Sequence, residues 1–203
     1  MQLWGDHRSG NCYKCALTAA WLGIDLAWVD TDVLQGQTRT PEFLQHNPNG
    51  KIPLLVLDDG RCLSESNAIV NYLAHGSALL PTEPYALAVV QQWQFFEQYS
   101  HEPHIAVARF IRLYQGMPAE RQAEYEAIIP GGYRALDVME TQLEKTAYLT
   151  GERVTVADLC LFAYTHVAAD GGFDLAPYRA IQRWLQSIQA QPQFVPMGHQ
   201  RGK

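Results

Sequence analysis

The stretch NPNGKIPLLVLDDGRCLSESNAIVNY, from Asn47 to Tyr72, decides the fold of the first part of the chain. The apolar run at 54–57, opened by Ile52-Pro53, predicts a strand, and Asp-Asp-Gly at 58–60 predicts the turn into a second strand. Glu65 and Ser66 stand where an apolar helical pattern begins. The first N–H groups of a helix lack partners and carry partial positive charge, so we interpret the stretch as a cradle for a small peptide that carries a carboxylate.

The residues on either side of this stretch predict a sheet with helices packed against it. Strands are expected at 2–5 and 26–31, with helices at 11–22, 41–46 and 66–74. The resulting order β-α-β-α-β-β-α is typical of an α/β domain.

Beyond residue 75 the pattern changes to helices alone. Gly, Ser, Thr and two Pro at 75–84 indicate a linker, and apolar residues then recur at helical spacing over 85–114 and 119–145. Thr155-Val-Ala-Asp158 has the form of a capping box, and a last helix is expected at 177–190. The sequence thus predicts a first domain at 1–75, a linker at 76–84 and an all-helical domain at 85–203.

Composition excludes several classes of function. The chain has 203 residues, 47% of them hydrophobic, and a formal net charge of -6, which argues against a nucleic-acid partner because phosphates need clustered Lys and Arg. No signal-peptide core and no membrane-spanning run are apparent, so a cytoplasmic protein with no membrane partner is expected. Without an oxidising compartment, the four cysteines are expected to be free thiols. No zinc-like spacing suggests a metal site.

Four sequence elements together resemble the cytosolic glutathione S-transferase family. They are Ser9-Gly-Asn11-Cys12 after the first strand, Asn47 to Pro53, Glu65 to Ile69, and Gly151 to Asp158. The resemblance covers essentially the whole chain and is nearest to bacterial members with Ser or Thr and Asn in the active-site loop. It implies a thioredoxin-like N-terminal domain with a mixed four-stranded sheet, an all-α C-terminal domain, glutathione as co-substrate and a homodimer.

The resemblance assigns the ends of glutathione to particular residues. Pro53 should follow a cis bond and leave the Ile52 backbone free to pair with the cysteinyl residue, although an edge strand could also begin with Pro. Ser66 would offer its hydroxyl and N–H to the γ-glutamyl carboxylate and Glu65 would take the ammonium, although both residues also suit a plain helix start. Lys51, Gln37 and Thr38 could contact the glycine carboxylate, with a solvated loop as the alternative.

The same resemblance places Ser9 and Asn11 at the thiol. A hydroxyl that donates to sulfur favours the thiolate, so Ser9 is the candidate catalytic residue and Asn11 a second donor; both could instead cap the first helix. Cys12 and Cys15 form a C-x-x-C sequence that suggests a redox pair, but the family register places Ser9 at the exposed position and predicts buried, inert thiols.

The helical part predicts less about chemistry. Its aromatic residues could wall a pocket for an electrophile, although stripes at helical spacing are usually core or dimer contacts. Arg109 and Arg112 could reach a carboxylate, although a solvated face is expected for them. The leading hypothesis is a glutathione transferase that detoxifies a small electrophile. The alternatives are a glutathione-dependent disulfide or peroxide reductase and a non-catalytic binding module.

Overall fold

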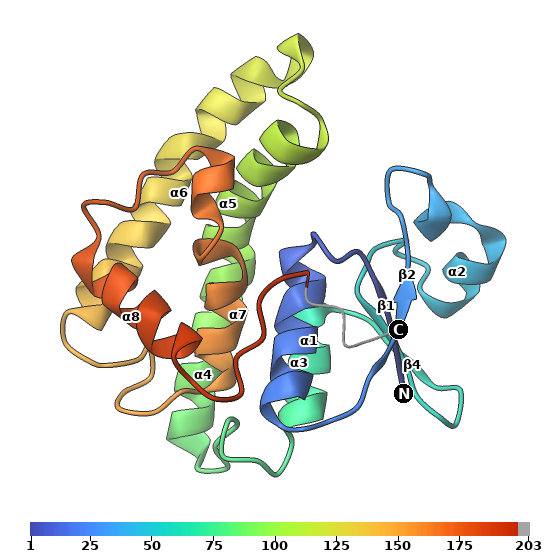
Figure 1. Ribbon diagram of the computed structural model, residues 1–203, viewed down its shortest axis with the longest axis horizontal. Helices are drawn as coiled ribbons and strands as arrows, with labels where there is room; N and C mark the ends of the chain where they lie inside the picture. The colour runs from blue at the N-terminus through green and yellow to red at the C-terminus, as the bar shows by residue number, and fades with distance from the viewer. Residues whose placement is uncertain (199–203) are drawn as a thin grey trace. The chain divides into compact units, whose positions relative to one another are not determined.

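The computed structural model describes residues 1–198. The chain divides into two compact units, coloured by residue number in Figure 1. Unit 1 comprises Met1–Leu80 and the described part of the segment from Pro192 onward, and unit 2 comprises Pro81–Gln191. The domain limits expected from the sequence stay a prediction.

Unit 1 is a four-stranded sheet with the strand order β2-β1-β3-β4. Its strands are β1 (Gln2–Gly5), β2 (Ala27–Asp30), β3 (Leu54–Val56) and β4 (Cys62–Leu63). β1 pairs in parallel with β2 and antiparallel with β3, which also pairs antiparallel with β4. The sheet is therefore mixed, as the resemblance implied. The turn between β3 and β4 is closed by the Leu57 N–H, which donates to the Arg61 carbonyl at 2.8 Å.

Three helices cover this sheet. They are α1 (Gly10–Trp21), α2 (Pro41–His46) and α3 (Ser66–Ala74). Helices α1 and α3 pack side by side on one face of the sheet, and α2 lies on the other face (Figure 1). The core contains fully buried apolar side chains such as Leu3, Leu17, Leu55 and Ile69. Burial of these side chains supplies most of the driving force for the fold of the unit.

The chain returns to unit 1 after the second unit is complete. The Tyr13 hydroxyl, on α1, donates to the Val195 carbonyl at 2.7 Å, across 182 positions of sequence. Sequence periodicity could not predict this contact, because residues 192–198 form no helix or strand.

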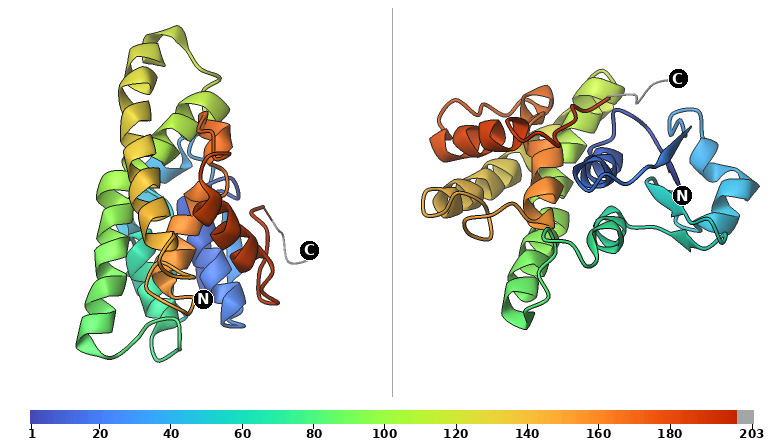
Figure 2. Two further views of the ribbon diagram at one scale, coloured as in Figure 1. Left: turned by 90° about the vertical axis from the view of Figure 1, so that its left-hand side faces the viewer. Right: turned by 60° about the horizontal axis from the view of Figure 1, so that its bottom comes forward.

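Unit 2 is helical. Its α-helices are α4 (Pro84–Phe96), α5 (Glu102–Arg109), α6 (Gln122–Leu143), α7 (Val156–Thr165) and α8 (Arg179–Gln189). Short helical turns occur at Ala119–Arg121 and Ala168–Gly171. Helix α6 packs against α5 and α8, and α7 packs against α4 and α5 (Figure 2). All ten residues of α7 are buried, which agrees with its apolar character on every side.

The helix expected at 85–114 is interrupted by two π-helical segments, η2 (Glu97–His101) and η3 (Phe110–Tyr114). Pro103 lies at the start of α5 and has no N–H to donate, so the regular ladder cannot continue through this point. π-helical turns inside longer helices are a common way to absorb such a shift of register. Apolar periodicity alone does not reveal them.

The predicted capping box is present at the start of α7. Asp158, which is fully buried, accepts hydrogen bonds from the Thr155 N–H at 2.9 Å and the Thr155 hydroxyl at 3.2 Å. Its other carboxylate oxygen accepts from the Leu149 N–H at 2.9 Å and from Trp184 Nε1 at 3.0 Å. One carboxylate thus joins the start of α7 to the preceding loop and to α8.

Candidate functional site

The pairing of the strands brings the predicted site residues to one end of the sheet in unit 1. Trp4 lies opposite Leu54, and Leu55 lies opposite Leu63. Continuing these registers sets the end of β1 beside Pro53, and Pro53 beside Glu65. The loop with Ser9, the Ile52-Pro53 turn and the start of α3 therefore meet there. Because β2 is parallel to β1, the loop with Gln37 leaves the sheet at the same end.

Ser9 is the N-cap residue of α1. Its backbone is extended, with φ -78° and ψ 122°, and its Oγ accepts from the Cys12 N–H at 3.3 Å. A hydroxyl that accepts a capping bond still has its own hydrogen to donate. Capping and donation to a ligand are therefore compatible roles, although the sequence offered them as alternatives.

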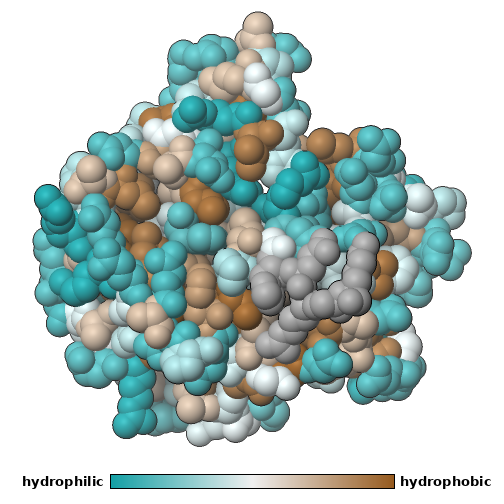
Figure 3. Space-filling model, viewed as in Figure 1, coloured by the Kyte–Doolittle hydropathy of each residue, from teal (hydrophilic) through white to brown (hydrophobic). Residues whose placement is uncertain are grey.

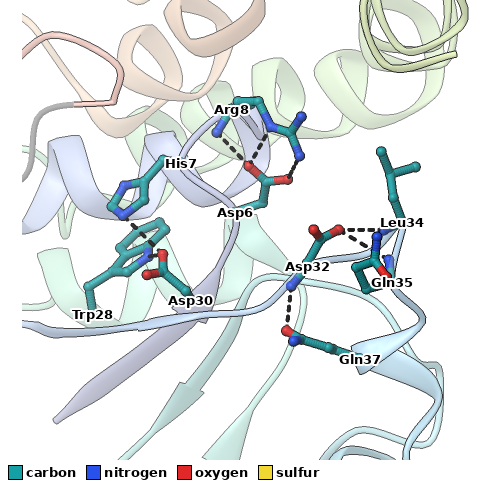
Figure 4. A network of polar contacts seen from close by, with 9 residues as sticks. All are labelled: Asp6, His7, Arg8, Trp28, Asp30, Asp32, Leu34, Gln35 and Gln37. Carbon is teal, nitrogen blue, oxygen red and sulfur yellow. Dashed lines mark hydrogen bonds and ion pairs between the residues drawn. The ribbon is translucent and has the colours of Figure 1, made fainter.

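The loop before Ser9 is closed by local polar contacts, which Figure 4 shows. Asp6 accepts from the Arg8 N–H at 2.8 Å and pairs with the Arg8 guanidinium at 2.8 Å. Next to them, the His7 ring stacks on Trp28 with centroids 4.1 Å apart, and His7 Nε2 lies 3.2 Å from the Asp30 carboxylate. These contacts tie the loop to β2. Sequence reasoning missed them, since no short-range spacing links the loop to β2.

The Ile52-Pro53 peptide bond is cis, as the resemblance implied. Pro53 is buried, whereas the preceding Lys51 is exposed. The Lys51 carbonyl accepts a hydrogen bond from Asn47 Nδ2 at 2.7 Å, so the Asn47 side chain stabilises the turn. The Lys51 side chain, one residue before Ile52 in the chain, is at the surface.

The start of α3 is marked by a residue with a strained backbone conformation. Glu65 has φ 66° and ψ 111°, and its side chain makes no capping hydrogen bond. A non-glycine residue in such a region costs of the order of 1 to 3 kcal/mol and occurs mostly at functional sites. The first bond within the helix is made by the Ile69 N–H to the Glu65 carbonyl. The start of a helix carries partial positive charge, which favours an anion at this position.

Ser66 and Asn11 are brought together although 55 positions separate them. The Ser66 hydroxyl donates to Asn11 Oδ1 at 3.2 Å. Ser66 is 5% exposed, and Asn11 is half-buried. The loop predicted to act on the thiol and the helix predicted to hold the carboxylate are thus directly connected.

Gln37 and Thr38 lie in a short 3₁₀ turn, Gln37–Arg39. Gln37 Oε1 accepts from the Asp32 N–H at 2.7 Å, which closes the loop after β2 (Figure 4). The Thr38 side chain is almost wholly buried, with 2% exposure. Both residues therefore shape the loop, and their contact with a ligand stays a prediction.

Cys12 and Cys15 are buried inside unit 1, and all four cysteines are free, as predicted. Burial raises the pKa of the Cys12 thiol to about 12. A Cβ at Gly5 would lie 2.7 Å from Cys12 Sγ, so only glycine lets β1 approach α1 this closely. Since the thiolate is the nucleophile, Cys12 is inert at neutral pH.

The aromatic residues of unit 2 divide between its interior and its surface. Trp93 is buried, whereas Phe95 and Tyr99 are 71% and 88% exposed. Trp93 and Phe96 also line a groove of about 470 Å³ between α4 and α6.

The prediction that Arg109 lies on a solvated face was wrong. Arg109 is 5% exposed, and its Nε donates to the Asp170 carboxylate at 3.0 Å. Arg112 is exposed.

Within residues 1–198 the structure contains neither a candidate metal site nor a helix suited to span a membrane. No group of three or more His, Cys, Asp or Glu side chains is placed to hold a metal ion in this part of the chain. Of the helices described, none has the length and apolar character needed to cross a membrane. Hydrophilic residues dominate the face drawn in Figure 3, with hydrophobic ones scattered among them.

Comparisons with known proteins agree with the fold. Residues 1–75 match the family model "Glutathione S-transferase, N-terminal domain" and residues 96–192 match "Glutathione S-transferase, C-terminal domain". A glutathione S-transferase structure from Pseudomonas fluorescens Pf-5 is 58% identical, covers 97% of this chain and 98% of that one, and has a TM-score of 0.95. The chain belongs to the glutathione S-transferase family.

Two further relatives show how widely the family's members differ in role. A maleylacetoacetate isomerase from Methylobacterium extorquens AM1, solved with bound malonate and glutathione, is 28% identical, covers 95% of this chain and 94% of that one, and has a TM-score of 0.80. Elongation factor 1-gamma of Carassius auratus is 32% identical over 91% of this chain. The chain spans about two fifths of the length of the curated relatives it matches, and 42% of the length of the Carassius auratus protein.

Proposed function

We propose that this protein is a glutathione transferase that holds glutathione at the sheet end of unit 1 as a thiolate. The thiolate attacks an electrophilic carbon of a small molecule, a carbon–sulfur bond forms, and the leaving group departs with its electron pair. The observation that carries the proposal is the convergence of Ser9, Ile52-Pro53 and the Glu65-Ser66 helix start at one end of the sheet. We further propose a cytoplasmic role in detoxification.

The residues would divide the tripeptide between them. The start of α3 at Ser66 would hold the γ-glutamyl carboxylate, and the exposed Glu65 would take the ammonium group. The Ile52 backbone would pair with the cysteinyl residue as an added strand does.

The remaining contacts would be made with the glycine carboxylate and with the thiol of the central cysteinyl residue. Lys51, Gln37 and Thr38 would lie nearest the glycine carboxylate. At the other side of the site, Ser9 would donate to the sulfur, with Asn11 as a second donor.

The test pairs a binding measurement with a rate measurement. Glutathione titrated by calorimetry should bind the wild-type protein, and Glu65→Ala should weaken binding about ten-fold because a hydrogen bond between charged groups is lost. Ser9→Ala should lower conjugation of 1-chloro-2,4-dinitrobenzene about 100-fold at saturating glutathione. Ser187→Ala, in α8, is the matched control and should change neither value. Absence of binding at millimolar glutathione would refute the proposal.

The non-catalytic alternative has one specific observation in its favour, the identity to elongation factor 1-gamma over most of this chain. Glutathione binding without turnover of either an aryl halide or a small disulfide would support it. Turnover of the disulfide alone would instead favour the reductase, with glutathione and not Cys12 as the reacting thiol.

A homodimer is the proposed assembly. Tyr85, Phe95 and Tyr99 fall on one side of α4 and η2 and are each more than two thirds exposed, next to the groove lined by Trp93 and Phe96. Exposed aromatic clusters of this kind are typical of interfaces. Sedimentation velocity should report a dimer for the wild type and a monomer for Phe95→Glu/Tyr99→Glu. A wild-type monomer would contradict this assembly.

A further inference from the structure

The four residues between β1 and α1, at 6–9, form a turn that is closed on itself. The Ser9 N–H donates to the Asp6 carbonyl at 2.9 Å, and the Arg8 N–H donates to the Asp6 carboxylate at 2.8 Å. The Asp6 side chain is only 10% exposed, so water competes little for the carboxylate. The turn therefore moves as one body, and a displacement of any of its residues also displaces Ser9.

His7 attaches this turn to β2 (Figure 4). Its ring stacks on Trp28, with centroids 4.1 Å apart and planes inclined by 18°. His7 Nε2 also lies 3.2 Å from Asp30 Oδ1. The stack sets the plane of the His7 ring, and the contact with Asp30 sets its rotation within that plane. Together the two contacts define a single orientation for the His7 side chain.

The two partners of His7 are themselves fixed to the sheet. Trp28 and Asp30 are two positions apart and lie on the same face of β2, and Trp28 Nε1 donates to Asp30 Oδ1 at 2.9 Å. The Thr31 N–H donates to the Gly5 carbonyl at 2.9 Å, which joins the end of β2 to the end of β1. A Cβ added at Gly5 would lie 3.3 Å from Trp28 Cη2. The Trp28 ring thus lies against the last residue of β1, directly before the turn.

The contact between His7 and Asp30 does not depend on the charge of the imidazole. An ionised carboxylate only accepts hydrogen bonds, whereas Nε2 donates both in the neutral Nε2–H tautomer and in the protonated ring. His7 can therefore donate to Asp30 in either state. A substitution is needed to remove the contact.

We propose that His7 is a positioning residue for Ser9, which it holds at hydrogen-bond distance from the glutathione sulfur. This inference rests on the proposed function and adds to it a residue that acts through the turn and not on the ligand. Hydrogen bonds weaken steeply away from their preferred geometry. A displacement of about 1 Å at a catalytic group can lower a rate by as much as about 100-fold. Trp28 and Asp30 act one step further away, because they hold His7.

The first test separates positioning from binding in the conjugation of 1-chloro-2,4-dinitrobenzene. His7→Ala should lower kcat about ten-fold. It should leave the KM for glutathione within about three-fold of the wild-type value, because the proposed contacts with the peptide backbone are made by Ile52 and the start of α3. The pKa of the bound thiol, followed by the ultraviolet absorbance of the thiolate, should rise by about 0.5 to 1. The matched control is His75→Ala, at an exposed position directly after α3, which should change none of these values.

The second test asks whether His7 acts through Ser9. When His7→Ala is added to Ser9→Ala, kcat should fall by less than about two-fold further, because the group that His7 positions is already absent. A structural role unrelated to Ser9 would lower kcat by the same factor in both backgrounds. Asp30→Ala should lower kcat in the same direction as His7→Ala. Asp30→Asn keeps an acceptor and should restore most of that loss.

Three results would overturn the inference. The first is a wild-type kcat and a wild-type thiol pKa in His7→Ala. The second is a ten-fold rise in KM with kcat unchanged, which would assign His7 to ligand binding. The third is an equal loss of kcat with and without the Ser9 hydroxyl. If His7→Ala does not fold, Asp30→Ala replaces it in every comparison, because the Asp30 side chain is 78% exposed and tolerates truncation.

Failure of the inference is distinguishable from failure of the proposed function. A wild-type protein that neither binds glutathione nor conjugates it refutes the function, and the inference with it. An active wild-type protein with an impaired Ser9→Ala variant, and a His7→Ala variant that behaves like the wild type, refutes the inference alone.

Discussion

Replacement of Asp158 with alanine is expected to destabilise unit 2 by about 3 to 5 kcal/mol. The carboxylate accepts three buried N–H groups, those of Leu149, Thr155 and the Trp184 ring. Each N–H group left without an acceptor costs about 1 to 3 kcal/mol. The Thr155 hydroxyl is not orphaned, because Thr150 Oγ1 lies 3.2 Å away. Partial relaxation brings the sum of the three losses to the stated range.

The unfolding free energy from urea titrations, followed by the far-ultraviolet circular dichroism of the helices, provides the measurement. Trp184→Phe is the matched control, since it removes one donor together with its need for an acceptor and should destabilise the unit by about 1 kcal/mol. A loss below 1 kcal/mol for Asp158→Ala would refute the idea that this carboxylate organises the unit.

The stability lost by this substitution should depend on pH. Burial raises the pKa of Asp158 from its ordinary value of 3.8 to about 6, against the opposing effect of its hydrogen-bond donors. At a pH between 3.8 and 6, Asp158 is protonated in the folded protein and ionised in the unfolded chain. Protonation of this group therefore stabilises the fold at pH 5, and the contribution is lost as the pH rises through 6. The difference between wild type and Asp158→Ala should therefore be about 1 kcal/mol larger at pH 5 than at pH 7. An equal or smaller difference at pH 5 would contradict the assignment.

Two further predictions concern the reactivity of the cysteines and the backbone at the start of α3. Iodoacetamide at pH 8 should label Cys62 alone in the native protein, because the other three cysteines, Cys12, Cys15 and Cys160, are fully buried. The raised pKa of Cys12 also keeps its thiol protonated. A second adduct in the intact mass spectrum would disprove this prediction. Glu65→Gly should be more stable than Glu65→Ala by about 1 kcal/mol, because glycine adopts the positive φ of this position without strain. Equal unfolding free energies for the two variants would show that the position is unstrained.

Most of the fold could be predicted from local patterns. The strand at 2–5 and the helix at 66–74 were found because apolar periodicity, turn residues and helix-start residues all agreed at those positions. The capping box of Asp158 was predicted for the same reason. Each of these features depends on residues within a few positions of one another.

The features that could not be predicted depend on distant contacts. The π-helical segments follow from the fit of a Pro-containing helix to its neighbours, and the burial of Arg109 follows from its pairing with Asp170, 61 positions away. At the site, the residue types were found by resemblance, but the Ser66 to Asn11 bond was not. Ser66 and Asn11 each fit a local role, and neither motif contains the information that the two helix starts meet.

The contact between Tyr13 and Val195 has a consequence for synthesis on the ribosome. Domains generally fold in the order in which they emerge, at about 5 to 20 residues per second. Unit 1 can form its sheet early, but the contact with Val195 has to wait until the whole of unit 2 has been translated. A nascent chain halted after residue 80 should therefore carry a first unit whose α1 surface at Tyr13 is still open to solvent, and unit 1 gains its last segment as one of the final steps of folding.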